Sequence, residues 1–459
     1  MRLSGSMNTE TSQPSAQVNL TLTKWELANF HLPPVTTVTL YSGTAPVQFL
    51  RHRIALLLKK NPWLTSRIVK KSTTDGVVAM TYDESDDAGQ RVDEHFRVYK
   101  PDEVGLTLNM QYAELVECLL PLQCARSKPA TDANEPLFKV AVVPIEGSTD
   151  STVSGPMHSA VILPGFALLV SMNHTVGDGH TYYSLYGMLD GDQEVEALDP
   201  VRVTGFEEAK TQLIGENENA MLSSAGYGLG IMGTYLLGKL TGREPQNICV
   251  HTIDPAWIAQ EKDRAAEEAK VPFVSTNDAL TSWFFREMQC DINIMVANFR
   301  SRKPAILDLT DYHAGNYEAN IPYFSGDIEE PALIRQSILS PENQFRARRA
   351  GSPATKIPGF TTLLRNKSAI ITNWSSFYRD VALHTDPKRE NSETCKPSLH
   401  LPIMEPDGLI TSVWHNGIVF CPRAGELGML MITRRFDSDA LIQRKREEGP
   451  GTPMGARLI

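Results

Sequence analysis

A glycine-rich turn between an apolar run and a helical run constrains the fold of this chain most. The run Ala160–Val170 is apolar and partly β-branched, which is typical of a buried strand. Residues 181–189 predict the start of a helix. The sequence H-T-V-G-D-G stands between them at 174–179, with a glycine on each side of the aspartate. Because glycine gives a turn unusual backbone freedom, this strand–turn–helix unit can direct a side chain into a cavity.

His174 is the candidate general base of this turn, and Asp178 is its companion. The ordinary pKa of a histidine lies near neutral pH, which suits proton transfer. The chain has 11 histidines, and only His174 has an aspartate four residues later. A turn histidine often only satisfies local hydrogen bonds. The motif by itself therefore leaves a catalytic and a structural interpretation equally open.

Composition describes an ordinary globular protein and excludes some partners. The chain has 459 residues, of which 41% are hydrophobic and 21% charged, so one large domain or two domains are expected. A net charge of -10 argues against a nucleic-acid partner. The 6 cysteines form no Cys-x-x-Cys pair, so we expect neither structural zinc nor a disulfide framework. Residues 1–17 are polar and lack the apolar core of a signal peptide, which favours a cytoplasmic location.

Helix and strand patterns occur in both halves of the chain, which predicts a mixed α/β protein. Val47–Leu58 carries a helical apolar face and ends before Pro62, and Ser275–Phe285 predicts a capped helix that packs in a core. Leu409–Val413 predicts a late strand. The expected order is a disordered N-terminus (1–17), a first domain (18–200), a crossover linker (201–246), a second domain (247–440) and a frayed tail (441–459).

The segment 220–238 is unusual because it contains no charged residue but five glycines. Its length reaches the lower limit for a membrane span. The spacing Gly226-x-x-x-Gly230 suits close helix packing. Serine, tyrosine and threonine dilute its apolarity, however, and glycines weaken a helix. The composition favours a buried or surface-packed segment and leaves peripheral membrane contact as the alternative.

Several motifs, in this order, resemble those of the BAHD acyltransferases of the chloramphenicol-acetyltransferase-like superfamily. They are the turn Pro62–Arg67, the His174–Gly179 motif, the helix Ser275–Phe285, Asn298–Arg302 followed by Ala314–Tyr317, and Asn373–Asp380. Two features depart from the family patterns. Residues 379–383 read R-D-V-A-L where the family carries Asp-Phe-Gly-Trp-Gly. Asn173 precedes His174, whereas condensation domains and wax-ester synthases carry a second histidine there, which favours the single-histidine branch.

The resemblance implies a fold and an activity. The fold would comprise two similar domains, each a mixed sheet with flanking helices, and a channel between them. The activity would be direct transfer of an acyl group from acyl-CoA to a hydroxyl or amine of a small acceptor. Acyl-CoA would be a co-substrate, with no permanently bound cofactor and no metal. A complete two-domain channel would allow a monomer to suffice.

The resemblance also implies roles for individual residues. His174 would be the general base, while Asp178 would pair with Arg300 and hold the turn. Donors to the tetrahedral intermediate, on the acceptor side, would be Gly179, Thr372, Asn373 and Trp374. Ser301, Arg302 and Lys303 would meet the phosphates of CoA. A core role for Trp374 and a solvated loop at 301–303 are the structural alternatives.

Three other functions stay open. The donor can be a carrier-bound thioester, as in condensation enzymes, or the acceptor can be a lipid, as in wax-ester synthases. His174, Asp178 and His180 have a spacing that could hold a divalent metal in a hydrolase. The departure at 379–383 also allows a catalytically inactive relative that only binds a ligand.

Overall fold

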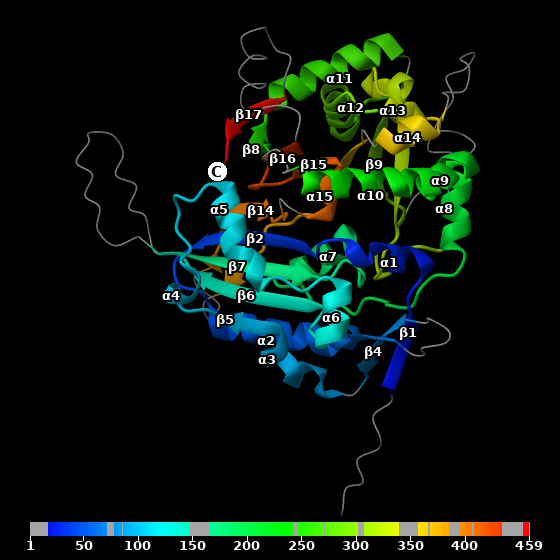
Figure 1. Cartoon of the computed structure of the whole chain (residues 1–459). Helices are drawn as coiled ribbons and strands as arrows, with labels where there is room; N and C mark the ends of the chain where they lie inside the picture. Colours follow the sequence, from blue (N-terminus) through cyan, green and yellow to red (C-terminus); the bar gives the residue numbers. More distant parts are fainter. Residues whose placement is uncertain are drawn as a thin grey trace, which may run out of the picture.

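The structure is a computed structural model of the whole chain. It describes residues 17–70, 78–84, 86–146, 165–241, 247–269, 271–301, 307–338, 357–365, 368–384, 394–405, 408–433 and 453–458. Two large sheets lie one above the other in Figure 1, and helices flank both of them. The helix that follows the H-T-V-G-D-G turn lies between the two sheets.

The lower sheet in Figure 1 has the strand order β14-β2-β7-β6-β5. Its strands are β2 (Val35–Ser42), β5 (Phe96–Val98), β6 (Phe138–Pro144), β7 (Gly165–Met172) and β14 (Pro397–Pro402). The β5–β6 pair is parallel and the other pairs are antiparallel, so the sheet is mixed. β14 belongs to the range expected for the second domain, yet it pairs with β2 from the first. The second half of the chain thus completes the sheet of the first half.

The upper sheet has the strand order β10-β9-β11-β15-β16-β8-β17. Its strands are β8 (Asn247–Ile253), β9 (Ile292–Asn298), β10 (Glu318–Tyr323), β11 (Ser368–Asn373), β15 (His415–Phe420), β16 (Gly428–Thr433) and β17 (Met454–Arg457). β11 runs parallel to both of its neighbours, and the other pairs are antiparallel. This second sheet is therefore also mixed.

Two small sheets and the helices complete the described fold. The small sheets are β1 (Gln17–Thr21) with β4 (Val78–Asp83) and β3 (Arg67–Lys70), and β12 (Leu383–His384) with β13 (Thr394–Cys395). The helices of the first half are α1 (Lys24–Ala28), α2 (Val47–Lys60), α3 (Val92–His95), α4 (Pro101–Val104), α5 (Tyr112–Leu119), α6 (Ser127–Ala133) and α7 (Gly179–Gly187). Those that follow are α8 (Phe206–Ile214), α9 (Glu216–Leu222), α10 (Ala225–Leu240), α11 (Pro255–Ala269), α12 (Thr276–Met288), α13 (Pro331–Ile338), α14 (Phe360–Arg365) and α15 (Leu409–Val413).

The upper sheet separates two hydrophobic clusters, and β16 shows how. Successive side chains of a strand point to opposite faces. Leu430 and Ile432 join the cluster that includes α2 and α7, whereas Met429 and Met431 join the cluster that includes α12. All four side chains are buried. This sheet is therefore covered on both faces, which places the α7 turn against its inner face.

The predicted helices at Val47–Leu58 and Ser275–Phe285 are confirmed as α2 and α12. The apolar face of α2 is buried, and the helix ends at Lys60, two residues before Pro62. Ser275 is the N-cap of α12, and its hydroxyl accepts a hydrogen bond from the Asp278 backbone at 3.2 Å. Local periodicity and capping signals are sufficient for such long elements.

Three segments differ from the expectation. Leu409–Val413 forms the helix α15 rather than a strand, because the periodicity of a five-residue run with three apolar residues does not separate the two. The tail expected to fray contains β17, which pairs with β8. The region 201–246, expected as a linker, contains α8, α9 and α10. Residues 1–16 of the predicted disordered N-terminus lie outside the described residues.

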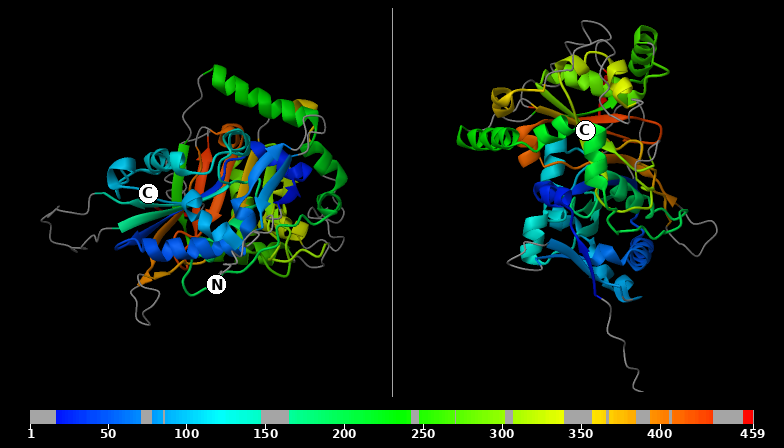
Figure 2. Two further views of the ribbon diagram at one scale, coloured as in Figure 1. Left: turned by 90° about the horizontal axis from the view of Figure 1, so that it is seen from below. Right: turned by 90° about the vertical axis from the view of Figure 1, so that its right-hand side faces the viewer.

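The uncharged segment 220–238 mostly falls within α10, which stands out from the body in both views of Figure 2. Gly226 and Gly230 are buried where α10 packs on α14. A Cβ on Gly230 would lie 2.1 Å from the Leu363 carbonyl oxygen, so glycine is needed for this approach. In the described part of the chain, no helix is both long and apolar enough to cross a membrane.

Candidate active site

The H-T-V-G-D-G turn joins the end of β7 to the start of α7. Asp178 is the N-cap of α7, and its Oδ1 accepts a hydrogen bond from the Thr181 backbone at 3.0 Å. Capping by aspartate satisfies an N–H group that the first helical turn leaves without a partner. The Asp178 side chain is 2% exposed. The aspartate therefore points into the protein and not toward solvent.

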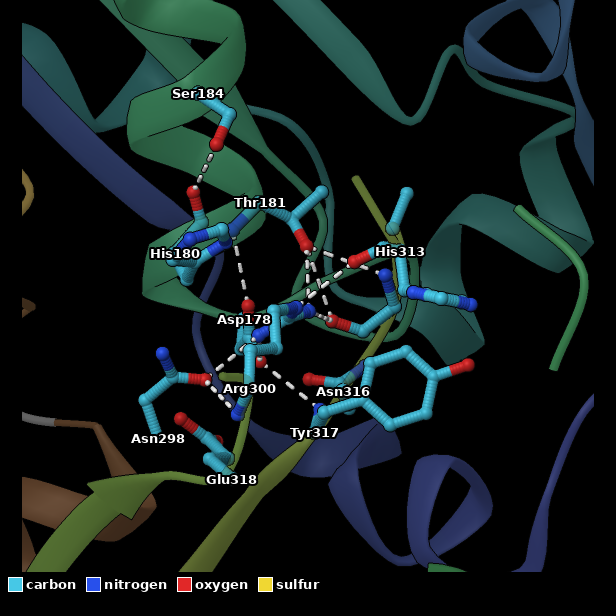
Figure 3. Close-up of polar contacts among 12 residues, drawn as sticks. Asp178, His180, Thr181, Ser184, Asn298, Arg300, His313, Asn316, Tyr317 and Glu318 are labelled. Atoms are coloured by element: carbon cyan, nitrogen blue, oxygen red, sulfur yellow. Dashed lines mark hydrogen bonds and ion pairs between the residues drawn. The ribbon is translucent and has the colours of Figure 1, made fainter. Parts of the chain in front are cut away.

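Arg300, which follows β9, meets Asp178 and uses all of its N–H groups there (Figure 3). Its Nη1 donates to Asp178 Oδ2 at 2.7 Å, and the arginine side chain is fully buried. The remaining acceptors are His313 O, Asn298 Oδ1, Thr181 Oγ1 and Gly315 O. A guanidinium has five donors, so each has an acceptor in this site. The structure thus places Asp178 and Arg300 in the contact that the resemblance implied.

The pKa of Asp178 reflects this pairing. Burial disfavours the charged carboxylate and would raise its pKa. The Arg300 guanidinium and the hydrogen bonds to the carboxylate outweigh burial, so the pKa lies below the ordinary value. Tyr317 N adds a donor to Asp178 Oδ2 at 2.9 Å. Asp178 is accordingly ionised and held, which suits a structural role.

Gly315 connects the turn to the strand that follows it in the upper sheet. Its carbonyl oxygen accepts from Asp178 N at 3.1 Å, from Arg300 Nη2 at 2.9 Å and from the Thr181 hydroxyl at 3.1 Å. Its φ is +142°, a backbone conformation that favours glycine. Gly177 is also constrained, because a Cβ there would lie 2.7 Å from Thr181 Cγ2. Gly315 thus allows the segment 314–317 to meet the turn, and Gly177 leaves room for the Thr181 side chain within the turn.

The His174 ring is 17% exposed, and Asn316 fixes its tautomer. Asn316 Nδ2 donates to the carbonyl oxygens of His174 and Thr175, at 2.9 and 3.3 Å. Since only the NH₂ group of the amide can donate to two carbonyls, Oδ1 is the atom that faces His174 Nδ1 at 3.2 Å. The ring therefore carries its proton on Nδ1. The lone pair on Nε2 is free, as a general base requires.

Glu318, the first residue of β10, faces the other edge of the ring. Its Oε1 lies 3.8 Å from His174 Nε2, and its side chain is 16% exposed. Burial raises the pKa of Glu318 to about 7, although the nearby His174 acts to lower it. Figure 3 shows Glu318 beside Asn298 and Arg300. A carboxyl group that titrates near neutral pH thus adjoins the candidate base.

A small cavity of about 30 Å³ lies beside these groups. Its lining comes from the α7 turn and the upper sheet: Asp178, Gly179, His180, Val296, Asn298, Glu318, Thr372, Asn373, Trp374 and Phe377. The His174 ring is not part of this lining and adjoins it through Glu318. Because about 10 to 15 Å³ of such space suffices for one water molecule, this cavity is much smaller than a thioester substrate. The channel implied by the resemblance is thus represented here by a narrow cavity.

Solved structures resemble this chain over nearly its whole length. F. graminearum TRI101 in complex with ethyl coenzyme A aligns with a TM-score of 0.58 and 12% identity, over 94% of this chain and 98% of that one. F. sporotrichioides TRI101 with coenzyme A and T-2 gives 0.57 and 13%, over 94% and 98%. The TRI3 trichothecene 15-O-acetyltransferase from Fusarium sporotrichioides gives 0.55 and 10%, over 95% and 94%. This chain has the chloramphenicol-acetyltransferase-like fold. No protein-family model and no curated protein matches the sequence.

The expectation of a chloramphenicol-acetyltransferase-like fold is therefore confirmed, and the structure brings several of the expected acceptor-side residues together. Gly179, Thr372, Asn373 and Trp374 all line the cavity. The indole of Trp374 lies against Gly179, 3.5 Å from where a Cβ would stand. The backbone N–H of Trp374 donates to Val419 O, and the amide of Asn373 contacts Asn277 and Ser375. Gly179 is the first residue of α7, where backbone N–H groups have no partner within the helix.

The expected phosphate contacts at 301–303 receive less support. Ser301 is exposed, and its hydroxyl donates to Asp311 Oδ1 at 3.0 Å. A neighbouring carboxylate disfavours an anion at that hydroxyl. Arg302 and Lys303 lie outside the described residues.

The alternative metal site would need His174, Asp178 and His180 as ligands, and the structure shows the partners of two of these side chains. Both Asp178 oxygens accept hydrogen bonds from protein donors. His180 Nε2 instead lies 3.5 Å from Asp311 Oδ1, and burial, followed by the Arg300 charge, lowers the pKa of His180. Over the described ranges, no three His, Cys, Asp or Glu side chains are grouped to hold a metal ion.

Sequence reasoning missed the residues that surround His174. Asn316 was visible in the segment 314–317, but nothing there indicated its contact with His174 Nδ1. Thr181 was read only as part of a helix start, whereas its hydroxyl bridges Arg300 and Gly315. Glu318 had no local signal, because its place depends on the pairing of β10 with β9.

Proposed function

We propose that this protein is an acyltransferase that moves an acyl group from acyl-CoA to a hydroxyl or amine of a small acceptor, with His174 as general base. One observation carries the proposal. Asn316 holds the His174 ring by Nδ1, so that the unprotonated Nε2 is directed toward Glu318, a residue of the cavity lining, in a chloramphenicol-acetyltransferase-like fold. The fold likeness to CoA complexes of TRI101 and to TRI3 supports the donor and the reaction class.

Proton transfer by His174 follows from this geometry. Nε2 takes the proton from the acceptor hydroxyl or amine as that group attacks the thioester carbonyl carbon. When the tetrahedral intermediate collapses, the carbon–sulfur bond breaks and the sulfur receives that proton from Nε2. The products are the acylated acceptor and free CoA. A positioned base contributes roughly 10²–10⁴-fold, so alignment of the two substrates supplies much of the remaining acceleration.

Charge on the tetrahedral intermediate needs hydrogen-bond donors. The Gly179 N–H is the first candidate, because the N-terminus of α7 also carries a partial positive charge. Thr372 is a second, since it lines the cavity beside Trp374. Asp178 and Arg300 act as a structural pair that fixes the turn. A single chain provides every group named here, so we propose that a monomer is active.

The test measures CoA release from acetyl-CoA and longer acyl-CoA thioesters with a panel of alcohols and amines. Wild-type protein should release CoA only when a suitable acceptor is present, and mass spectrometry should find the acylated acceptor. His174→Gln should lose at least about 100-fold in rate while its circular dichroism stays unchanged. His251→Gln, the same replacement on β8 of the upper sheet and away from the α7 turn, should keep the wild-type rate.

Two outcomes of this test favour the other functions. Turnover with a phosphopantetheine-carrier thioester but not with free acyl-CoA would identify a condensation-type donor. Tight acyl-CoA binding without turnover across the panel would identify an inactive ligand-binding relative. A fully active His174→Gln variant would contradict the role of the base.

We further propose that the exposed face of α10 rests on a lipid surface. The exposed apolar side chains of α10 and α14 are Leu229, Met232, Leu236, Leu237, Leu240, Phe360 and Leu364. The only charged residues of these two helices are Lys239 and Arg365, both basic, in a chain whose net charge is -10. An apolar face flanked by cations suits an anionic bilayer surface, where each cation contributes about 1 kcal/mol. α10 also stands out from the body, where a flat surface can reach it (Figure 2).

Flotation with phosphatidylcholine–phosphatidylserine vesicles tests this contact. Wild-type protein should float with these vesicles and much less with phosphatidylcholine alone. A Leu236→Glu/Leu240→Glu variant should remain at the bottom. Leu108→Glu, at an exposed leucine elsewhere, should float like wild type. Equal flotation of wild type and the double variant, or none by wild type, would contradict lipid contact by α10.

A further inference from the structure

Among the described residues, Glu318 is the acidic side chain whose contact with Nε2 of the candidate base is seen, at 3.8 Å. Asn316 and Glu318 are two residues apart, and they contact opposite edges of the His174 ring. Asn316 Oδ1 faces Nδ1 at 3.2 Å, and Glu318 Oε1 faces Nε2 at 3.8 Å. A polar group on each edge leaves the ring little freedom to turn.

Arg300 lies near Glu318, but its N–H groups bind other acceptors. Arg300 acts on Glu318 through space, but each of its five N–H groups has another acceptor. Asp178 also faces the group and repels its negative charge. His180 lines the same cavity. His174 is therefore the group on which a Glu318 carboxylate can act most directly.

We propose that Glu318 is a positioning residue that, when ionised, stabilises the protonated form of His174 during acyl transfer. The proposal rests on the proposed function of His174. As Nε2 takes the acceptor proton, the ring gains a positive charge 3.8 Å from the Glu318 carboxyl oxygen. Opposite charges at such a distance attract strongly where protein partly excludes water. The same attraction holds the Nε2 proton until the thiolate sulfur takes it.

Because Glu318 is buried, its effect on His174 depends on pH. Burial raises the pKa of Glu318 to about 7, so the charge of this side chain changes near neutral pH. The two groups interact, so they titrate as a pair and not independently. Activity should therefore rise through neutral pH as Glu318 ionises.

The first experiment compares the pH profiles of kcat/KM for wild type, Glu318→Gln and Glu318→Asp. Glu318→Gln keeps the shape of the side chain and removes its charge. We expect its plateau to fall about tenfold and its acid limb to lose the ionisation near pH 7, because the variant has no carboxyl group to titrate at position 318. Glu318→Asp keeps the charge and should retain the acid limb of wild type with a reduced plateau. Asp311→Asn removes one carboxylate beside His180 instead and should leave the profile unchanged.

The second experiment needs no turnover. Carbon-13 NMR of labelled glutamate should show a Glu318 carboxyl signal that titrates near pH 7 in wild type and is absent in Glu318→Gln. In His174→Gln the midpoint should move higher, because the charge that lowers the pKa of Glu318 is gone.

The two experiments separate failure of this inference from failure of the proposed function. A Glu318 signal that titrates near pH 4.5 in both proteins, or a Glu318→Gln profile with the wild-type acid limb, would overturn the inference even in an active enzyme. If Glu318 and His174 titrate as a pair but the protein transfers no acyl group, the contact between them is supported. The acyltransferase function on which the inference rests would then be refuted.

Discussion

Arg300 Nη1 lies 2.7 Å from Asp178 Oδ2, and both side chains are buried. The pair joins the turn after β7 to the segment after β9, so it connects the two large sheets at the candidate site. Because Arg300 also holds the Gly315 carbonyl, the pair sets the place of the segment that carries Asn316 and Glu318. The positions of the groups around His174 therefore depend on the Asp178–Arg300 pair, although that contact does not involve the His174 ring.

Asp178→Asn should destabilise the protein by about 3 to 5 kcal/mol at pH 7, because it leaves a buried guanidinium without its counter-charge. Chemical denaturation measures the change. Asp93→Asn is the matched control: the Arg51–Asp93 pair has the same 2.7 Å distance but is exposed. Removing that pair should cost less than about 1 kcal/mol. Equal losses in the two variants would contradict the importance of burial.

The pH dependence of this loss has a definite sign. The pKa of Asp178 lies below its ordinary value of 3.8, so its ionised form stabilises the fold above that value. The stabilisation is lost as the pH falls through the lower, folded-state pKa. The difference between wild type and Asp178→Asn should therefore be constant from pH 7 to about pH 5 and shrink in stronger acid.

Asn316→Leu should lower kcat by about tenfold, the effect of losing one well-placed hydrogen bond. Without the Oδ1 acceptor, Nδ1 no longer holds the ring proton, so the Nε2–H tautomer becomes more populated and the base is blocked. Nitrogen-15 NMR of labelled histidine reads the tautomer directly. Asn320→Leu, a similar replacement later in β10, should leave the His174 signals unchanged. An unchanged tautomer in Asn316→Leu would contradict this role.

The sequence predicted those features that arise from local patterns. α2 and α12 follow from apolar periodicity and a capping serine, which act within one helix. The turn at 174–179 follows from glycines between a strand and a helix. The motif resemblance added Arg300 as the partner of Asp178, although 122 residues separate them. Such a long-range contact has no local signal of its own.

The sequence did not predict features that depend on strand pairing. Glu318 pairs with Asn298 across β10 and β9, and this register brings the carboxyl group to His174. A one-residue shift would turn the side chain to the other face of the sheet. β14 and β17 are similar cases, since each adds an edge strand to a sheet whose other strands lie far away in the sequence. The helix α15 was mistaken for a strand because a run of five residues, three of them apolar, fits both periods.

Glu318→Gln should stabilise the protein at pH 8 and leave its stability unchanged at pH 4. The pKa of Glu318 is raised from 4.5 to about 7, so the fold disfavours the ionised carboxyl group. At pH 4 the group is protonated in folded and unfolded chains alike. As the pH rises past 4.5, the unfolded chain ionises first, and the fold loses up to about 3 kcal/mol by pH 8.

Thermal unfolding of both proteins at the two pH values measures this difference. The uncharged glutamine lacks the penalty, so its melting temperature should exceed that of wild type only at the higher pH. Together with the expected loss of activity, this result would show that the Glu318 carboxylate lowers the stability of the fold while it supports the reaction. The raised pKa of Glu318 would be contradicted if Glu318→Gln melted higher than wild type at pH 4, or if the two proteins melted at the same temperature at pH 8.

Gly230→Ala and Gly233→Ala should have opposite effects, although both place alanine in α10. A Cβ at position 230 would lie 2.1 Å from the Leu363 carbonyl oxygen, so α14 must move or α10 must detach. Overpacking of this kind costs about 1 to 3 kcal/mol. At position 233 nothing lies within 4 Å, and alanine should stabilise the helix by about 0.5 to 1 kcal/mol. Denaturation of the two variants measures both effects. Because intrinsic helix propensity favours alanine at either position, destabilisation by Gly230→Ala alone would show that packing on α14, and not the helix itself, requires the glycine.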